Sequence, residues 1–251
     1  MPASAKILRM NGHFRSVYVT GTDTGIGKTA SSCALLHALR AQGLRAVGMK
    51  PLASGSERTP DGWRNEDALA LQAASDPQPC YDDVNPFALP NPLAPQLAAR
   101  DAGVTVTPGP IRAAHARLAA QADVVVVEGV GGWAAPLADD LLQADVARML
   151  DLPVVLVVGL RLGCLNHAFL SARAIQADGL RLVGWIGNAI DPDMARREDN
   201  LVLLQAGLAV PCWGVLPHAP AADARLFSRS LRLPAGMFGT SGMVGRASPG
   251  C

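Results

Sequence analysis

The chain has 251 residues and a formal net charge of +1, so it lacks the basic excess expected of a nucleic-acid-binding protein. Hydrophobic residues make up 49% of it and aromatic residues only 4%, which favours a core of Ala, Val, Leu and Ile. No apolar run reaches the roughly 20 residues of a membrane span, and none near the first residue is long enough for a signal peptide. We therefore expect a cytoplasmic protein without nucleic-acid or membrane partners.

The first predicted elements are a strand that starts at Ser16, a glycine-containing loop and a helix over residues 29–42. The loop ends in Gly27, Lys28 and Thr29, an order typical of a phosphate-binding loop. Backbone N–H groups would surround the phosphates, Lys28 would supply positive charge and Thr29 would offer a hydroxyl to Mg²⁺. Thr22 stands where the usual pattern has its first glycine, so the loop is a variant. A simpler alternative is that these residues only cap a helix.

The later elements alternate along the chain. Val/Ile/Leu-rich runs predict strands at residues 45–49, 123–127, 153–158, 182–186 and 212–216, and helical spacing predicts helices at 111–120, 141–150 and 164–177. Such strands, separated by helices, indicate an α/β fold with three layers and a mostly parallel, helix-covered central sheet. We expect one domain over 16–226, an N-terminal extension over 1–15, a long functional loop over 75–95 and a disordered tail over 227–251.

Polar residues follow several of the predicted strands, at the edge where ligands of parallel sheets bind. Lys50 and Ser54 follow the second strand, and Glu128 precedes a run of glycines after the next one. Asn188 ends a later strand. Each has a simpler interpretation when taken alone: Lys50 as a solvated lysine, Glu128 as a solvated acid before a flexible turn and Asn188 as a turn residue. Asp67 could likewise be a polar residue at the start of a helix.

Six segments together resemble dethiobiotin synthetases, and the resemblance runs from about Val17 to Pro217. They are Gly-Thr-Asp-Thr-Gly-Ile-Gly-Lys-Thr from Gly21, Lys-Pro-Leu-Ala-Ser-Gly-Ser-Glu from Lys50, Arg-Asn-Glu-Asp-Ala-Leu-Ala-Leu from Arg64, Val-Asn-Pro-Phe from Val84, Val-Glu-Gly-Val-Gly-Gly-Trp from Val127 and Leu-Gly-Cys-Leu-Asn-His from Leu162. Six motifs in one order are far more specific than the phosphate loop, which indicates only a nucleotide. The resemblance implies a P-loop NTPase fold and a homodimer.

The resemblance also implies a role for each matching residue. Lys50 and Lys28 would be catalytic, and Thr29, Asp67 and Glu128 would hold Mg²⁺. ATP would be bound by Gly25, Ile26, Gly27, Lys28, Thr29, Ala30, Asp67, Glu128, Gly129, Val130, Gly131, Asn188, Ala189, Pro217, His218 and Ala219. Diaminopelargonate would contact Thr24 and Ser54, and Gly163, Cys164, Leu165 and Asn166 would reach the partner subunit's substrate.

The reaction implied by the resemblance is the ATP-dependent carboxylation of 7,8-diaminopelargonate with CO₂ and its closure to a cyclic urea. It needs no side-chain nucleophile, in keeping with a predicted site made of lysines, hydroxyls and acids. The chain departs from the family at Gly25, where some members have an acid, and at 221–224, where members often have a glutamate near the nucleotide. The alternatives are a cobyrinate amidase-like ligase and a ParA-like switch ATPase. Such a ligase needs a glutaminase domain, and such switches carry an extra lysine where this chain has Thr22 and Asp23.

Overall fold

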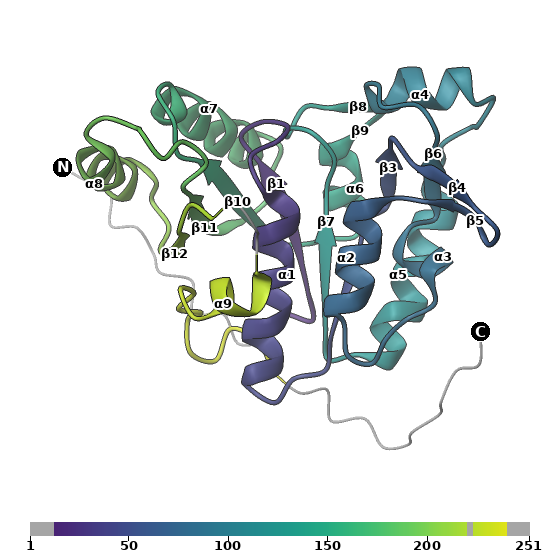
Figure 1. Cartoon of the computed structure of the whole chain (residues 1–251), viewed down its shortest axis with the longest axis horizontal. Coiled ribbons are helices and arrows are strands. Elements are labelled where there is room, and N and C mark those ends of the chain that lie inside the picture. The colour runs from purple at the N-terminus through teal and green to yellow at the C-terminus, as the bar shows by residue number, and fades with distance from the viewer. Residues whose placement is uncertain (1–12, 220–222, 240–251) are drawn as a thin grey trace.

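The computed structural model describes residues 13–219 and 223–239 and is built around a six-stranded parallel sheet (Figure 1). The strand order is β12-β11-β10-β1-β7-β2. The strands are β1 (Ser16–Gly21), β2 (Ala46–Met49), β7 (Val124–Glu128), β10 (Val154–Gly159), β11 (Leu182–Asn188) and β12 (Cys212–Leu216). All five pairings are parallel, so the carboxyl ends of the six strands lie along one edge. The five later strand predictions and the α/β fold class are confirmed, with boundaries shifted by one or two residues.

Helices cover both faces of this sheet and make the other two layers. They are α1 (Lys28–Ala41), α2 (Glu66–Ala74), α3 (Tyr81–Val84), α4 (Pro95–Asp101), α5 (Pro108–Gln121), α6 (Gln143–Met149), α7 (Cys164–Ala177), α8 (Arg197–Gly207) and α9 (Ala224–Ser228). One buried cluster joins α1, α2, α3 and α9 to the sheet, and the other joins α4 to α8. The predicted helices at 29–42, 111–120, 141–150 and 164–177 correspond to α1, α5, α6 and α7.

Strand β7 shows why these runs lack a polar face. Val125 and Val127 belong to one buried cluster, whereas Val124 and Val126 belong to the other. Alternate side chains point to opposite faces of a strand, and helices cover both faces here, so every position must be apolar. The first polar residue of the run is Glu128, at the carboxyl edge.

Within the described residues, six short strands form three small sheets beside the main sheet, and one of them lies in the segment expected to be a long loop. They are β3 (Leu52–Ser54), which pairs with β6 (Phe87–Leu89), and the antiparallel pairs β4 (Glu57–Thr59) with β5 (Gly62–Arg64) and β8 (Pro136–Ala138) with β9 (Leu141–Leu142). The segment 75–95 was expected to be one long loop, but it contains α3 and β6. Proline and polar residues hid these two elements, which are three or four residues long.

The prediction of a disordered tail is wrong for residues 227–239. Phe227, Leu231 and Phe238 are buried in the same cluster as α1. The Phe238 ring packs edge-on against Trp213 with ring centroids 6.2 Å apart. The backbone of Phe238 also forms an isolated parallel β-bridge with Phe14. These three buried side chains are irregularly spaced and give no periodic pattern, so the tail's Gly-, Ser- and Pro-rich composition wrongly predicted disorder. Residues 240–251 lie outside the described residues, as do 1–12 of the N-terminal extension.

Gly214 shows how closely this tail approaches the sheet. Its φ is +148°, and a Cβ there would collide with the backbone carbonyl of Ser230. Glycine has no Cβ, so the segment after α9 can form its bridge from Leu231 to Gly214. Within the described residues, no helix is long and apolar enough to cross a membrane.

Candidate functional site

The predicted phosphate loop lies between β1 and α1, at the carboxyl edge of the sheet. Gly27 directly precedes α1 with φ +81°, and a Cβ there would clash with the side-chain amide of Asn188. That amide donates a hydrogen bond of 2.9 Å to the carbonyl oxygen of Ile26. The loop therefore rests on the end of β11, and only glycine fits at position 27.

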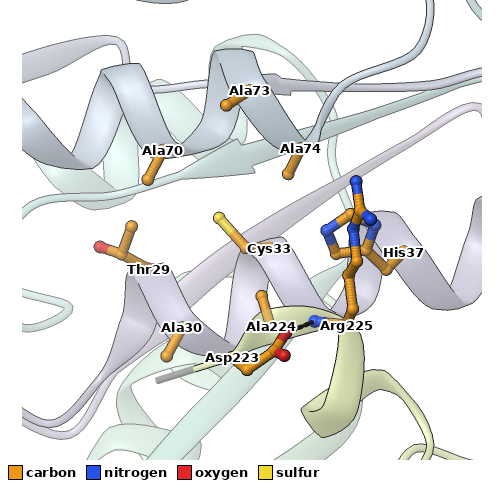
Figure 2. Close-up of a pocket in the computed structure, with 10 residues that line it drawn as sticks. All are labelled: Thr29, Ala30, Cys33, His37, Ala70, Ala73, Ala74, Asp223, Ala224 and Arg225. Carbon is orange, nitrogen blue, oxygen red and sulfur yellow. Dashed lines mark hydrogen bonds between the residues drawn. The ribbon is translucent and has the colours of Figure 1, made fainter. Parts of the chain in front are cut away.

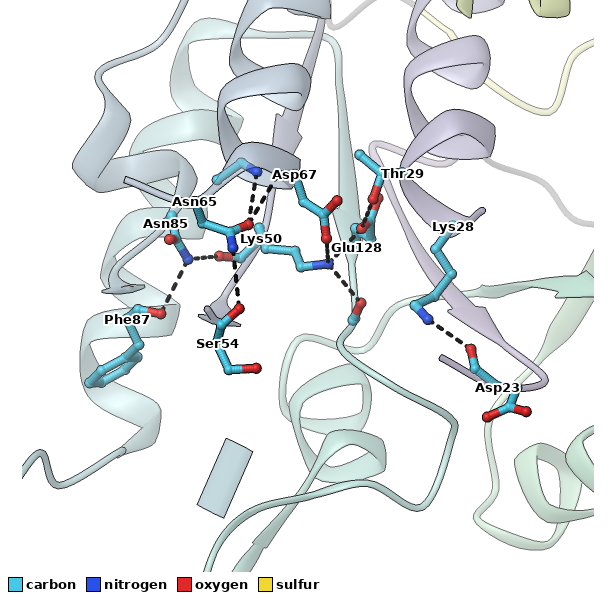
Figure 3. A network of polar contacts seen from close by, with 12 residues as sticks. Asp23, Lys28, Thr29, Lys50, Ser54, Asn65, Asp67, Asn85, Phe87 and Glu128 are labelled. Carbon is cyan, nitrogen blue, oxygen red and sulfur yellow. Dashed lines mark hydrogen bonds and ion pairs between the residues drawn. The ribbon is translucent and has the colours of Figure 1, made fainter. Parts of the chain in front are cut away.

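Lys28 opens α1 and turns back over the loop. Its Nζ donates to the carbonyl oxygen of Asp23 at 2.9 Å (Figure 3). The Asp23 carboxylate accepts from Arg161 at 2.8 Å, which ties the loop to the segment after β10. Burial and the nearby Lys50 ammonium lower the pKa of Lys28 to about 8.

Lys50 lies directly after β2 and is only 3% exposed. Its Nζ donates to Glu128 Oε1 at 2.6 Å and to Asp67 Oδ2 at 2.9 Å (Figure 3). Burial disfavours the ammonium, but the two carboxylates outweigh it, so the pKa of Lys50 is raised. The interpretation of Lys50 as a solvated surface lysine is therefore wrong.

Two acids and a hydroxyl gather around Lys50. Glu128 is fully buried, and its Oε1 also accepts a hydrogen bond of 2.8 Å from Thr29 Oγ1, whereas its Oε2 has no partner. Burial would raise the pKa of Asp67, but Lys50 and Thr29 more than offset it and the pKa is lowered. The structure thus brings together the three residues expected to hold Mg²⁺, from α1, α2 and β7. It also rules out the interpretation of Glu128 as a solvated acid.

The chemistry of these donors fits Mg²⁺. A hydroxyl and two carboxylates are hard oxygen ligands, and Glu128 Oε2 is a buried acceptor that lacks a partner. No group of three or more His, Cys, Asp or Glu side chains able to hold a metal occurs among the described residues. Mg²⁺ is commonly held by one or two carboxylates together with substrate phosphates, which matches this sparse set.

The residues expected to bind the second substrate fall into two groups. Ser54 ends β3, and Thr24 lies exposed in the phosphate loop, so both stand near the lysines. Gly163, Cys164, Leu165 and Asn166 lie instead at the start of α7, after β10. In the chain as described, no hydrogen bond or ion pair joins this second group to the cluster around Lys50. Leu162 beside them is 89% exposed.

The residues expected around the base lie at the ends of β11 and β12. Ala189, Pro217 and His218 line a cavity of about 530 Å³. His218 Nδ1 lies 3.1 Å from the carbonyl oxygen of Ala189, which joins the two loops. Asn188 is 8% exposed, and its amide nitrogen is engaged by Ile26, so the interpretation of Asn188 as a simple turn residue does not hold. Ala219 is the last residue described before 220–222.

Gln143 is a site residue that the sequence did not indicate. It is fully buried at the start of α6, and its Nε2 donates to Thr20 Oγ1 at 3.0 Å and to the carbonyl oxygen of Gly132 at 2.9 Å. A Cβ on Gly129 would run into Gln143 and the Tyr18 hydroxyl. Gln143 therefore packs against Gly129 and hydrogen-bonds to Gly132, and so holds the glycine segment 129–132 after β7 in place. A lone glutamine inside a helical pattern gave no signal of this.

A second cavity, of about 630 Å³, runs over α1 between α2 and α9 (Figure 2). Alanines of α1, α2 and α9 form most of its walls, and Thr29 lies at one end. Burial raises the pKa of the Cys33 thiol to about 12, so this thiol is a poor nucleophile. Burial and the charges of Arg40 and Arg225 lower the pKa of His37. Two of the lining residues, Thr29 and Ala30, belong to the expected nucleotide site, whereas the two expected catalytic lysines do not line this cavity.

Comparisons with known proteins agree with this geometry. A family model described as an AAA domain matches residues 15–225. The chain is 67% identical to a protein named ATP-dependent dethiobiotin synthetase from Xanthomonas euvesicatoria over 217 residues, covering 86% of this chain and 97% of that protein. A protein of the same name from Xylella fastidiosa is 67% identical, covering 81% of this chain and 90% of that one.

Solved structures show the fold. A ParA family ATPase from Chlorobium tepidum superposes with a TM-score of 0.52 at 15% identity, covering 86% of this chain and 91% of that one. The cell division protein FtsY from Thermotoga maritima gives 0.52 at 18% identity, covering 90% of this chain, which spans 66% of FtsY. The fold is that of the P-loop NTPases, and the much closer sequence relatives show that the chain belongs to the ATP-dependent dethiobiotin synthetase family of ligases.

Proposed function

We propose that this chain converts 7,8-diaminopelargonate, CO₂ and ATP into the cyclic urea dethiobiotin, ADP and phosphate, with Mg²⁺ as the cofactor. The observation that carries the proposal is Lys50, buried between Asp67 and Glu128 beside the phosphate loop. The 67% identity to a protein named dethiobiotin synthetase supports the choice of substrate.

In this reaction one substrate amine adds to CO₂ and loses a proton, giving a carbamate. A carbamate oxygen attacks the γ-phosphorus of ATP, the bond to ADP breaks, and a carbamic-phosphoric anhydride results. The second amine then attacks the carbamate carbon, phosphate leaves and the ring closes. Each step gains from positioning and charge stabilisation, which lysines and backbone amides can provide without a covalent intermediate on the protein.

The two lysines are assigned to the phosphoryl group that moves. Lys28 and the backbone N–H groups from Gly25 to Ala30, in the loop and the first turn of α1, hold the phosphates, and Lys50 neutralises charge that develops on the phosphoryl oxygens. Supporting this assignment, the raised pKa of Lys50 keeps its ammonium charged at neutral pH. Ser54 and Thr24, on either side, are assigned to the diamine substrate.

Thr29, Asp67 and Glu128 would hold Mg²⁺, as the partnerless Glu128 Oε2 suggests. Mg²⁺ bound there would neutralise phosphate charge. Gly129, Val130 and Gly131 would let the backbone approach the substrates after β7. Asn188, Ala189, Pro217, His218 and Ala219 are assigned to the base, with Asn188 also supporting the loop through Ile26.

The test is phosphate release measured with ATP, Mg²⁺, bicarbonate and 7,8-diaminopelargonate, with the product identified by mass. We expect release to require both the diamine and bicarbonate, and the product to have the mass of the cyclic urea. A switch ATPase of the same fold would instead respond to DNA, a membrane or a protein partner. Release that ignores the diamine, or a product other than the cyclic urea, would reject the proposed reaction.

We also propose that the chain works as a homodimer in which Gly163, Cys164, Leu165 and Asn166 complete the partner's site. Leu162, just before α7, is 89% exposed and Leu170, in the middle of α7, is 55% exposed, and a second copy would cover these apolar side chains. The alternative is that these residues serve their own chain.

A mixing experiment separates the two arrangements, because an isologous dimer shares residues reciprocally. Asn166→Ala and Lys50→Ala chains, each inactive alone, are combined. If the site is shared, each hybrid dimer has one site with both mutations and one with neither, so activity returns to about half the wild-type level per hybrid. If mixtures shown to exchange subunits stay inactive, the residues do not cross between subunits.

A further inference from the structure

The segment from Tyr81 to Phe87 carries a sequence motif, Val84-Asn85-Pro86-Phe87, that the proposed chemistry does not use. In the structure it lies against the residue after β2. The backbone N–H of Lys50 donates to the Val84 carbonyl at 2.7 Å, and the Lys50 carbonyl accepts from Asn85 Nδ2 at 2.7 Å (Figure 3). The backbone of Lys50 is therefore held on both sides by one short segment.

The two prolines explain why the Lys50 backbone needs these hydrogen bonds from Val84 and Asn85. Pro51 follows Lys50 and has no N–H, so the chain after β2 cannot continue a regular ladder. A proline also disfavours the helical region for the residue before it, and Asn85, before Pro86, lies outside that region with φ −134° and ψ 79°. Asn85 then supplies the Lys50 carbonyl with a partner that a neighbouring strand would otherwise give.

Tyr81 connects Asn85, and through it the Lys50 backbone, to Asp67. Its hydroxyl donates to Asn85 Oδ1 at 3.1 Å and accepts from the backbone N–H of Asn65 at 2.7 Å. Asn65 caps α2: its Oδ1 accepts from the N–H of Asp67 at 3.1 Å. A continuous chain of hydrogen bonds thus runs from the Lys50 carbonyl through Asn85, Tyr81 and Asn65 to the backbone of Asp67.

The direction of this chain is fixed at every link. A tyrosine hydroxyl has a single proton, and here it is given to Asn85, so the oxygen is free to accept from Asn65. Asn85 Nδ2 uses its second hydrogen on the Phe87 carbonyl at 3.3 Å. Asn65 and Asn85 are each less than 6% exposed, so water cannot easily replace a lost link. The Arg64 guanidinium lies 4.1 Å from the Tyr81 ring centroid and holds the ring in place.

From these contacts we infer that Tyr81 is a positioning residue that sets the Lys50 ammonium relative to the Asp67 carboxylate. Lys50 follows β2 and Asp67 lies on α2, and their 2.9 Å contact depends on how these two parts of the chain meet at this edge. Among the described hydrogen bonds, the Tyr81 hydroxyl joins Asn85, which holds the Lys50 carbonyl, to Asn65, which caps α2 at Asp67. The inference rests on the proposed role of Lys50 in phosphoryl transfer.

Ser75 offers a matched control. Its hydroxyl also joins β2 to α2, accepting from the Gly48 N–H at 2.9 Å and donating to the Leu71 carbonyl at 2.7 Å. It is buried like Tyr81 but lies at the opposite end of α2 from Asp67. Removing either hydroxyl costs a pair of buried hydrogen bonds at one end of α2, but only those of Tyr81 lead to the site.

The experiment compares Tyr81→Phe with Ser75→Ala. For Tyr81→Phe we expect kcat to fall about tenfold or more with the KM for ATP within twofold, because small displacements of a reacting group are costly. For Ser75→Ala we expect a lower Tm with kcat within twofold of wild type. If Tyr81→Phe lowers Tm while kcat stays within twofold, Tyr81 only stabilises the fold and the inference is wrong.

Two further measurements keep the inference testable in every case. If Tyr81→Phe does not fold, Asn85→Ser replaces it and carries the same kcat and KM criteria. A crystal structure of the variant reports on the geometry even if the proposed reaction fails: we expect the Lys50 Nζ to Asp67 Oδ2 distance to increase beyond hydrogen-bonding range. A variant that keeps the wild-type distance would overturn the positioning role independently of the reaction.

Discussion

The two halves of the carboxyl edge of the sheet differ in how they use charge. Beyond β1, β2 and β7, the side chains of Lys28, Lys50 and Glu128 are buried, and Lys50 forms ion pairs with Glu128 and Asp67. Beyond β11 and β12, the buried polar side chain among the described residues is the neutral Asn188, and the His218 imidazole joins the two loops through the Ala189 carbonyl. The first half is arranged for charge that moves during a reaction, and the second for shape.

This division has an energetic cost on one side only. Removing charged groups from water is expensive, and buried ion pairs seldom return more than they cost, so the cluster around Lys50 is not explained by stability. In the proposed reaction its fixed charges are already in place when a phosphoryl group must be stabilised, which is where preorganisation is most effective. The neutral half can be changed at lower cost to the fold.

The largest effect is expected from Lys50→Ala. Losing the ammonium should slow turnover about 10²-fold or more, while ATP binding is largely kept, because the charge acts on the moving phosphoryl group. Turnover and ATP affinity are measured side by side, with circular dichroism to confirm folding. Lys50→Met, which keeps the volume, separates loss of charge from loss of packing. Turnover within threefold of wild type in both variants would remove Lys50 from the mechanism.

Glu128→Gln and Asp67→Asn are expected to come next. Each replaces a charged oxygen ligand by a neutral amide, so the Mg²⁺ concentration needed for half-maximal turnover should rise about tenfold. The measurement is a Mg²⁺ titration at saturating ATP. Asp82→Asn is the control, because this carboxylate is 90% exposed and its ion pair with Arg64 is long, at 4.0 Å. Titration curves that coincide with wild type would show that the two acids do not bind the metal.

A smaller, pH-dependent effect is expected at Lys28. Its pKa in the folded chain, about 8, lies below its ordinary value of 10.5, so the ammonium loses its proton as the pH rises through about 8. ATP affinity should be highest below that pH and fall severalfold by pH 9, since a neutral amine attracts phosphate poorly. For unfolding the sign is opposite: the unfolded chain binds more protons between pH 8 and 10.5, so this group makes stability rise with pH there.

The measurement is the Kd for ATP from pH 7 to 9.5. Lys28→Arg serves as the control, because arginine stays charged throughout this range and its Kd should not follow the same curve. A wild-type Kd that is constant over the range would contradict a lowered pKa for Lys28.

The sequence predicted the charged half of the edge better than its surroundings. Parallel strands place their carboxyl ends together, so residues at strand ends, such as Lys50 and Glu128, could be expected along one edge, and the resemblance to a family assigned them to one site. Burial could not be predicted, because it depends on side chains from distant segments: Asn85 and Tyr81 reach Lys50 from a stretch that was expected to be a loop. Gln143 was missed for the same reason.

The tail shows the opposite error. Its composition suggested disorder, yet Phe227, Leu231 and Phe238 fill a hydrophobic cluster beside β12. Composition reports the average of a segment, whereas burial there depends on three side chains and on a glycine that lets the chain come close. Tertiary contacts of this kind have no local sequence pattern.

The smallest effect is expected from Asn188→Ala, in the neutral half. Removing the amide leaves the Ile26 carbonyl without its 2.9 Å partner and loosens the phosphate loop, so ATP affinity should fall severalfold. Because the loop is proposed to bind the phosphates, the affinity for GTP should fall by the same factor. Asn200→Ala is the control, since that side chain bonds the exposed Arg196 carbonyl on α8, away from the loop. The Kd values for ATP and GTP are compared in all three proteins. A change in the ratio of the two would mean that Asn188 reads the base, and that the neutral half discriminates between nucleotides by hydrogen bonding as well as by shape.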